Sequence, residues 1–275
     1  MSLLCIENGK LWDGERFFHA NVLVNEETGL VEYIGPERQR AETVFDASDA
    51  IVSAGLVDAH VHLWGVSSDR YGMQAEMACL PFGVTACADA GAEKEGAQRL
   101  DCAAVRSCVF VAVEIRKNTP NLLAAEKLVC HYGSRAIGLK VYFDTTVSDV
   151  WDAAALKAVC AFAHTRGLRV MVHCSHAPVA MRELLSELGA GDILTHIYHG
   201  GENSAAEDDF AALLRAQQHK IDQRNIPFVK HLAVVRKRQP LAVGMMLAVQ
   251  HALREIPRVA DDVGARSFPA DPKLQ

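Results

Sequence analysis

Hydrophobic and polar positions follow two different patterns along this chain, and the change between them falls near Ile51. Residues 1–50 hold short apolar runs: "LLCIE" precedes Asn8-Gly9, "NVLV" precedes "NEETG", and "LVEYIG" ends at Gly35-Pro36. Apolar runs of this length between Gly, Asn and Pro are typical of strands joined by tight turns. The pattern predicts a small antiparallel β domain over residues 1–50.

From Ile51 onward, strand-like apolar runs alternate with helix-like stretches such as "VWDAAALKAVCAFAHTRG" and "VAMRELLSELGAG". Strands are predicted at residues 55–62, 83–90, 107–114, 136–143, 168–174 and 192–198. Strand and helix in alternation indicate an α/β fold, with a parallel sheet and crossover helices. The units are about 27 residues long, and polar residues collect at the carboxyl ends of the strands. Both features favour a (β/α)8 TIM-type barrel over an open sheet.

Residues 218–275 do not continue this repeat. Strand seven is expected near residue 223 and strand eight near residue 250, where the chain reads "KIDQRNIPF" and "LAVGMMLAVQHALREI". Residues 1–217 hold 18 Lys and Arg against 29 Asp and Glu, a net charge of −11, whereas residues 218–275 hold 10 against 5, a net charge of +5. Three interpretations stay open for this segment: a disrupted or truncated end that leaves the barrel incomplete, a divergent but folded replacement, and a basic arm that binds nucleic acid or a membrane. The expected division is therefore a β domain at 1–50, barrel strands one to six at 51–217, and a divergent or disrupted segment at 218–275.

Composition narrows the class of protein. Half of the chain is hydrophobic and 23% is charged, which predicts a packed core. A net charge of −6 gives no whole-chain reason to expect nucleic acid as a partner. No uncharged apolar run reaches the ~18 residues of a membrane span, and the N-terminus lacks the pattern of a signal peptide. The eight cysteines form no CxxC pair. We therefore expect reduced thiols in a cytoplasmic protein, and a homo-oligomer is left open.

Candidate metal ligands lie on four of the predicted strands. His60 and His62 are one residue apart in "GLVDAHVH", and residues i and i+2 of a strand face the same way. His173 ends "RVMVH", His196 ends "DILTH", and Lys140 lies inside "IGLKVYF". Neutral imidazole is a common zinc ligand. Carboxyl ends of parallel strands meet at one edge of a sheet, so these side chains point to a shared metal site.

Each of these residues taken alone also has a structural explanation. A histidine that closes a strand is more often a hydrogen-bonded rim residue than a ligand, and a lysine can extend its ammonium group to the surface. A lysine buried without a partner, however, has a lowered pKa, because burial disfavours its charged form. Its neutral amine can react with carbon dioxide to form a carbamate, which is an anionic oxygen ligand able to bridge two cations. The combination of residues favours a metal site over coincidence.

These motifs resemble those of the amidohydrolase superfamily of metal-dependent hydrolases. "GLVDAHVH" resembles the strand-one signature G-x-x-D-x-H-x-H, "GVTACADAGA" the strand-two segment, "GLKVYF" the strand that carries a carboxylated lysine, and "VMVHCSHAP" and "GDILTHIYHGGEN" the strand-five and strand-six histidine segments. The set is most similar to the deacetylase and dihydroorotase-like branch, over roughly residues 3–218. The resemblance implies two divalent ions, usually zinc. One ion is expected on His60 and His62, the other on His173 and His196, with carboxylated Lys140 as the bridging ligand.

The resemblance further implies hydrolysis of an amide, ester or cyclic amide by a metal-bridging hydroxide. The family places an aspartate at the end of strand eight to move the proton, but no aspartate ends a convincing strand here. Asp222, Asp261 and Asp262 are available, and we assign no catalytic residue. His199 is expected to contact substrate, and His176 lies just beyond a ligand position in the same way. Both residues could equally be rim histidines bound to water. The alternative from another class is an inactive or truncated metal-binding remnant.

Overall fold

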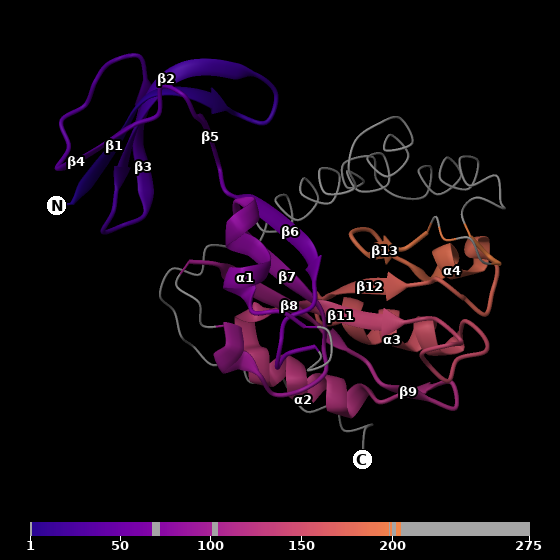
Figure 1. Cartoon of the computed structure of the whole chain (residues 1–275). Coiled ribbons are helices and arrows are strands. Elements are labelled where there is room, and N and C mark those ends of the chain that lie inside the picture. Colours follow the sequence, from indigo (N-terminus) through magenta and orange to yellow (C-terminus); the bar gives the residue numbers. More distant parts are fainter. Residues whose placement is uncertain (1, 68–71, 101–103, 198, 200–201, 205–275) are drawn as a thin grey trace. The chain divides into compact units, whose positions relative to one another are not determined.

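The computed structural model describes residues 2–67, 72–100, 104–197, 199 and 202–204 (Figure 1). The chain divides into two compact units between Gly55 and Leu56. The segment 218–275 and the positions expected for strands seven and eight lie outside the described residues, and so do the three candidate aspartates of that segment.

The first unit is a five-stranded sheet in the order β3-β2-β1-β4, with β5 also paired to β1. Its strands are β1 (Leu3–Trp12), β2 (Phe17–Asn25), β3 (Leu30–Gly35), β4 (Thr43–Asp46) and β5 (Ile51–Ser53). β1, β2 and β3 pair antiparallel, but β4 and β5 run parallel to β1. The expectation of a purely antiparallel sheet was therefore wrong. The residues after β3 carry the chain to the far side of β1, so β4 cannot form a hairpin with its predecessor.

Asn8-Gly9, read from the sequence as a turn between strands, instead forms a bulge within β1. The register with β2 shifts between Ile6 and Gly9, and Asn8 has a positive φ of 60°. The Asn8 backbone N–H donates to Asn21 Oδ1 at 2.9 Å, and its side chain donates to Asp46 Oδ1 at 2.9 Å. These bonds replace the strand pairing that the bulge interrupts, so the strand continues through a signal that elsewhere ends one.

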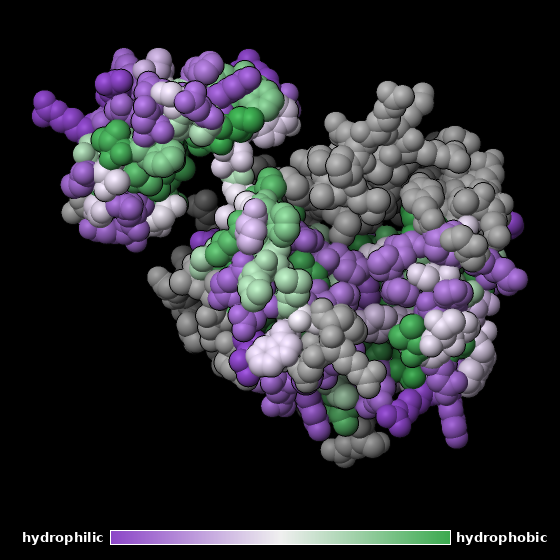
Figure 2. All heavy atoms as spheres, viewed as in Figure 1, coloured by the Kyte–Doolittle hydropathy of each residue, from purple (hydrophilic) through white to green (hydrophobic). Residues whose placement is uncertain are grey.

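The hydrophobic core of this unit is small. It consists of Leu11, Ala20 and Val22 with a few partly buried neighbours. Several large apolar side chains remain exposed: Phe17, Leu30, Val31, Ile34, Val44, Phe45 and Ile51. Apolar surface is visible on this unit in Figure 2.

The second unit contains a six-stranded sheet in the order β13-β12-β11-β8-β7-β6, and all neighbours in it are parallel. The strands are β6 (Leu56–Val61), β7 (Val84–Ala92), β8 (Arg106–Ala112), β11 (Ala136–Tyr142), β12 (Arg169–His173) and β13 (Ile193–Thr195). A short hairpin of β9 (Ile115–Arg116) and β10 (Thr119–Pro120) follows β8. Each strand of the large sheet lies beside the next one in the chain, which is the order found in half of a (β/α)8 barrel. The α/β class is confirmed, and the complete barrel stays a prediction.

Helices connect the strands of this sheet. They are α1 (Ala75–Cys79), α2 (Leu122–Tyr132), α3 (Ala154–His164) and α4 (Met181–Glu187), with short 3₁₀ turns η1 (Leu80–Phe82), η2 (Ala97–Leu100) and η3 (Gly133–Arg135). The side chain of Asn121 accepts from the Ala124 N–H at 3.2 Å and so caps α2. Among the described residues, no helix combines the length and apolar character needed to cross a bilayer.

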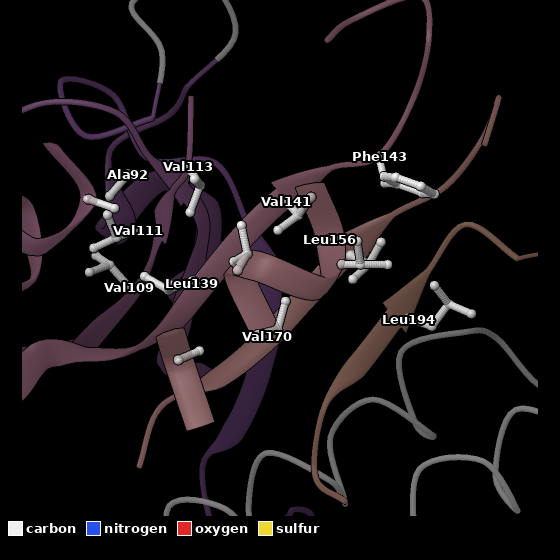
Figure 3. Packing of buried hydrophobic residues seen from close by; sticks show 14 of the residues in the cluster. Ala92, Val109, Val111, Val113, Leu139, Val141, Phe143, Leu156, Val170 and Leu194 are labelled. Atoms are coloured by element: carbon white, nitrogen blue, oxygen red, sulfur yellow. The ribbon is translucent and has the colours of Figure 1, made fainter. Parts of the chain in front are cut away.

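Alternate residues of the strands face two different layers. On β11, Leu139 and Val141 belong to the main core, where they pack with α3 residues such as Leu156 (Figure 3). Lys140 lies between them in the strand and so faces the opposite side of the sheet. That side also holds a smaller apolar cluster that includes Phe110 and Met171. The sheet thus directs Lys140 away from the helices, towards its inner face.

Candidate metal centre

Four of the five predicted ligands are histidines, and the structure brings them together at the carboxyl ends of their strands. The His60 ring centroid lies 5.5 Å from that of His62 and 5.2 Å from that of His196. The centroids of His173 and His196 are 4.6 Å apart. His60 lies in β6, His62 follows its last residue, His173 ends β12 and His196 follows β13. Asp58 accepts from the His60 backbone N–H at 3.0 Å, which fixes the chain just before the ligand pair.

His196 has an unusual backbone conformation. Its φ is 62°, in the left-handed region that residues other than glycine rarely adopt. Such a conformation costs on the order of 1–3 kcal/mol and tends to occur at functional sites, where the surrounding structure maintains it. The turn places the His196 ring against those of His60 and His173 instead of continuing the strand.

Lys140, the fifth predicted ligand, is fully buried in β11. Within the part of the chain that the structure describes, its Nζ atom has no hydrogen-bond partner. In the sheet its neighbours are Met171 on β12 and Ala112 on β8, neither of which offers a polar side chain. The face of the Tyr142 ring also lies near the amine, with its centroid 5.6 Å from Nζ. Burial lowers the pKa of Lys140 to about 7, so a substantial share of the amine is neutral near neutral pH.

The electrostatics of the cluster keep its histidines uncharged. Burial, followed by the charge of Lys140, lowers the pKa of His60 to about 2. Partial burial of the ring and the neighbouring charges of His173 and Lys140 lower the pKa of His196 to about 4. Burial and the charge of Lys140 also lower the pKa values of His62 and His173. Since a metal binds neutral imidazole, all four rings are in the ligating form at pH 7.

This donor set suits divalent cations. Four neutral imidazoles and one buried amine without a hydrogen-bond partner are an unfavourable grouping unless something positively charged, or a modification of the lysine, completes it. Among the described residues, no three His, Cys, Asp or Glu side chains are arranged to hold a metal ion. The fit therefore rests on the chemistry of the donors and on the burial of Lys140 Nζ.

Asp89, within β7, holds the segment that follows β6. It is fully buried and accepts from the Leu63 N–H at 2.7 Å, the Gly91 N–H at 3.0 Å and the Ser67 hydroxyl at 2.5 Å. The Ser67 oxygen also lies 3.2 Å from His62 Nδ1. Burial raises the pKa of Asp89 to about 6 despite these bonds, so the carboxylate is ionised at pH 7. Because the Ser67 proton goes to Asp89, the Ser67 oxygen accepts from His62 Nδ1–H, and Nε2 carries the ring's lone pair.

We predict that Asp89→Asn destabilises the metal-free protein by about 1–3 kcal/mol. The new amide group must face the N–H of either Leu63 or Gly91, which leaves a buried donor without an acceptor. Urea denaturation followed by circular dichroism measures this change. Asp49→Asn, in an exposed turn, is the matched control and should change the free energy of unfolding by less than about 0.5 kcal/mol. Equal stability of the two variants would contradict the assigned role of Asp89.

Asp144 was not among the predicted site residues. It lies two residues beyond β11 and is almost fully buried. Its Oδ2 atom is 3.1 Å from His173 Nε2 and 3.2 Å from His176 Nδ1. The position of Asp144 just after a parallel strand, where functional groups often lie, was the signal for it in the sequence. The ring of His199, the expected substrate contact, lies 6.3 Å from that of exposed His176. His199 therefore lies next to the Asp144 group, and its contact with substrate stays a prediction.

No protein-family model matches the chain. A deacetylase from Agrobacterium fabrum is 26% identical over 183 residues, which cover 60% of this chain and 45% of that protein. A deacetylase from Brucella anthropi is 24% identical over the same shares. The chain thus spans less than half the length of these curated relatives. Among solved structures, a dihydroorotase matches with a TM-score of 0.67 and 22% identity, over 78% of this chain and 63% of that one. This last likeness shows the fold.

Proposed function

We propose that this protein is a metal-dependent hydrolase of amides, esters or cyclic amides. The premise is that relatives named deacetylase, and a fold shared with a dihydroorotase, fit a protein of the amidohydrolase superfamily, in its deacetylase and dihydroorotase-like branch. The observation that carries the proposal is the buried Lys140 amine beside four neutral histidines. The relatives do not favour the alternative of an inactive remnant.

In this proposal His60 and His62 would hold one divalent ion, His173 and His196 would hold a second, and carboxylated Lys140 would be a ligand shared by both. The neutral Lys140 amine adds to carbon dioxide, forms a new N–C bond and releases one proton, which leaves an anionic carbamate. When bound, such ions polarise a scissile carbonyl and lower the pKa of a coordinated water. Zinc is the proposed metal, because imidazole nitrogen and carbamate oxygen are donors that it accepts.

The chain's own side chains prepare this site before any ion arrives. The lowered pKa values of the four histidines remove the charge repulsion that would otherwise oppose a cation. Asp89, through Ser67, orients His62. The proposed substrate is a small molecule that enters from the carboxyl ends of the strands, where barrel active sites lie. His199 is the proposed contact to it, and the group that protonates the leaving amine or alcohol is not assigned.

The test is hydrolysis by the full chain loaded with zinc in bicarbonate buffer. Three classes of probe cover the proposal: N-acetylated amino acids, an O-acetyl ester, and cyclic amides of the dihydroorotate and hydantoin type. We expect turnover of at least one class, its loss on adding a chelator and its return when zinc is restored. A protein that holds two ions per chain yet hydrolyses none of the three classes would overturn the proposal in favour of a metal-binding remnant.

A further inference from the structure

Asp144 is the acceptor at the centre of a buried hydrogen-bond group. Its Oδ1 atom accepts from the Thr146 N–H at 2.8 Å and from the Thr146 hydroxyl at 2.6 Å. Its Oδ2 atom faces His173 Nε2 at 3.1 Å and His176 Nδ1 at 3.2 Å. Four donors thus surround one carboxylate whose residue is only 1% exposed. Each oxygen has a defined set of partners, so the carboxyl group cannot rotate freely.

The contacts of Asp144 decide which nitrogen atoms of its partners carry protons. Its Oδ1 atom accepts from both donors of Thr146, and its Oδ2 atom faces the ring nitrogens of His173 and His176. An ionised carboxylate only accepts hydrogen bonds, so each nitrogen that faces it must carry a proton. Neutral His173 therefore carries its proton on Nε2 and its lone pair on Nδ1.

We propose that Asp144 is a positioning residue that fixes the tautomer of His173. His173 then presents Nδ1 to the metal centre, whereas His62 presents Nε2. The inference rests on the proposed function, which supplies the metal that Nδ1 of His173 would bind. The tautomer itself follows from contacts within the chain. The same carboxylate holds exposed His176 through Nδ1, which ties the orientation of a surface histidine to that of a buried ligand.

Asp144→Asn tests this role with little change of shape. The Thr146 N–H and hydroxyl keep the oxygen of the new side chain on their side, so its NH₂ group faces His173 and His176. A donor in that place requires an acceptor at His173 Nε2, and the proton must move to Nδ1. The variant therefore reverses the tautomer and blocks the nitrogen that binds the metal.

The direct readout is the ¹⁵N chemical shift of both ring nitrogens in the metal-free full chain labelled with ¹⁵N-histidine, recorded where the imidazoles are neutral. We expect His173 to be protonated on Nε2 in the wild type and on Nδ1 in Asp144→Asn. Zinc titration should show one of the two ions bound about 10- to 100-fold more weakly, as for other residues that orient metal ligands. A wild-type His173 protonated on Nδ1 overturns the proposal without any variant, and so does unchanged zinc affinity in Asp144→Asn.

Asp192→Asn is the matched control. Asp192 also accepts from a histidine, His164 Nε2 at 2.9 Å, and from the N–H groups of Val170 and Gly189 at 2.8 Å. It lies by the first residues of β12, at the opposite end of that strand from His173. Loss of an Asp–His bond there should leave zinc affinity unchanged. A wild type that binds no metal would refute the proposed function, whereas the tautomer measurement in metal-free protein would still decide the role of Asp144.

Discussion

Lys140→Met is expected to stabilise the metal-free protein by about 1–3 kcal/mol and to abolish its hydrolytic activity. The wild-type structure buries an amine whose Nζ has no hydrogen-bond partner among the described residues. Methionine has nearly the same length and flexibility but no polar end, and it would lie beside Met171 and Ala112. The gain in stability accompanies the loss of the bridging ligand, which is the usual opposition between stability and function at an active site.

The pH dependence of this gain has a definite sign. The pKa of Lys140 is about 7 in the folded protein, against 10.5 ordinarily. Between these pH values the unfolded chain binds more protons, so the wild-type free energy of unfolding rises with pH. The advantage of Lys140→Met is therefore greatest at pH 7 and below, and it shrinks as the pH rises towards 10.5. Urea denaturation of metal-free protein at about pH 7 and about pH 9 measures both effects.

Lys127→Met is the control for that experiment, since Lys127 is exposed on α2. Its free energy of unfolding should change by less than about 0.5 kcal/mol at either pH. A Lys140→Met variant that is less stable than the wild type would show that the amine has a favourable partner, and the assignment of Lys140 as a buried ligand would fail.

His60→Asn is expected to lower kcat/KM by roughly 100-fold or more. Removal of a ligand weakens metal binding, and the ion supplies several kcal/mol of transition-state stabilisation, of which 1.36 kcal/mol corresponds to a factor of ten. His60 contacts the rings of both His62 and His196, so its loss affects both sides of the cluster. Kinetics with the best probe substrate, together with metal analysis of the same sample, measures the change.

His19→Asn is the control for this substitution, because His19 is exposed on β2 in the first unit. It should retain wild-type metal content and activity. A His60→Asn protein with both properties intact would mean that His60 is a rim histidine with no ligating role.

Sequence patterns predicted the parallel sheet closely, since buried strands leave continuous apolar runs. The run predicted at residues 136–143 corresponds to β11 (Ala136–Tyr142), and the run at 168–174 to β12 (Arg169–His173). The same patterns failed at Asn8-Gly9, where hydrogen bonds that Asn8 donates to Asn21 and Asp46 convert a turn signal into a bulge. Contacts between distant residues decided that outcome, and no local pattern contains them.

The candidate site shows the same division. His60, His62 and Lys140 could be predicted because strand periodicity and residue type suffice to place them. The position of Asp144 just after a strand was a signal, but its contacts could not be predicted, because they depend on histidines 29 and 32 residues later in the chain meeting one oxygen atom. Ser67 was missed for a similar reason, since its contact with Asp89 spans 22 residues. Residues proposed to orient the ligands are thus less visible in the sequence than the predicted ligands themselves.

The metal content of freshly purified, unchelated full chain tests the central claim most directly. Elemental mass spectrometry per mole of folded protein should find about two zinc-like ions, consistent with the four histidines and Lys140 forming one binuclear site. A content of zero, or only a trace, in folded protein would contradict the account, because the buried amine and neutral imidazoles would then have no cation to bind.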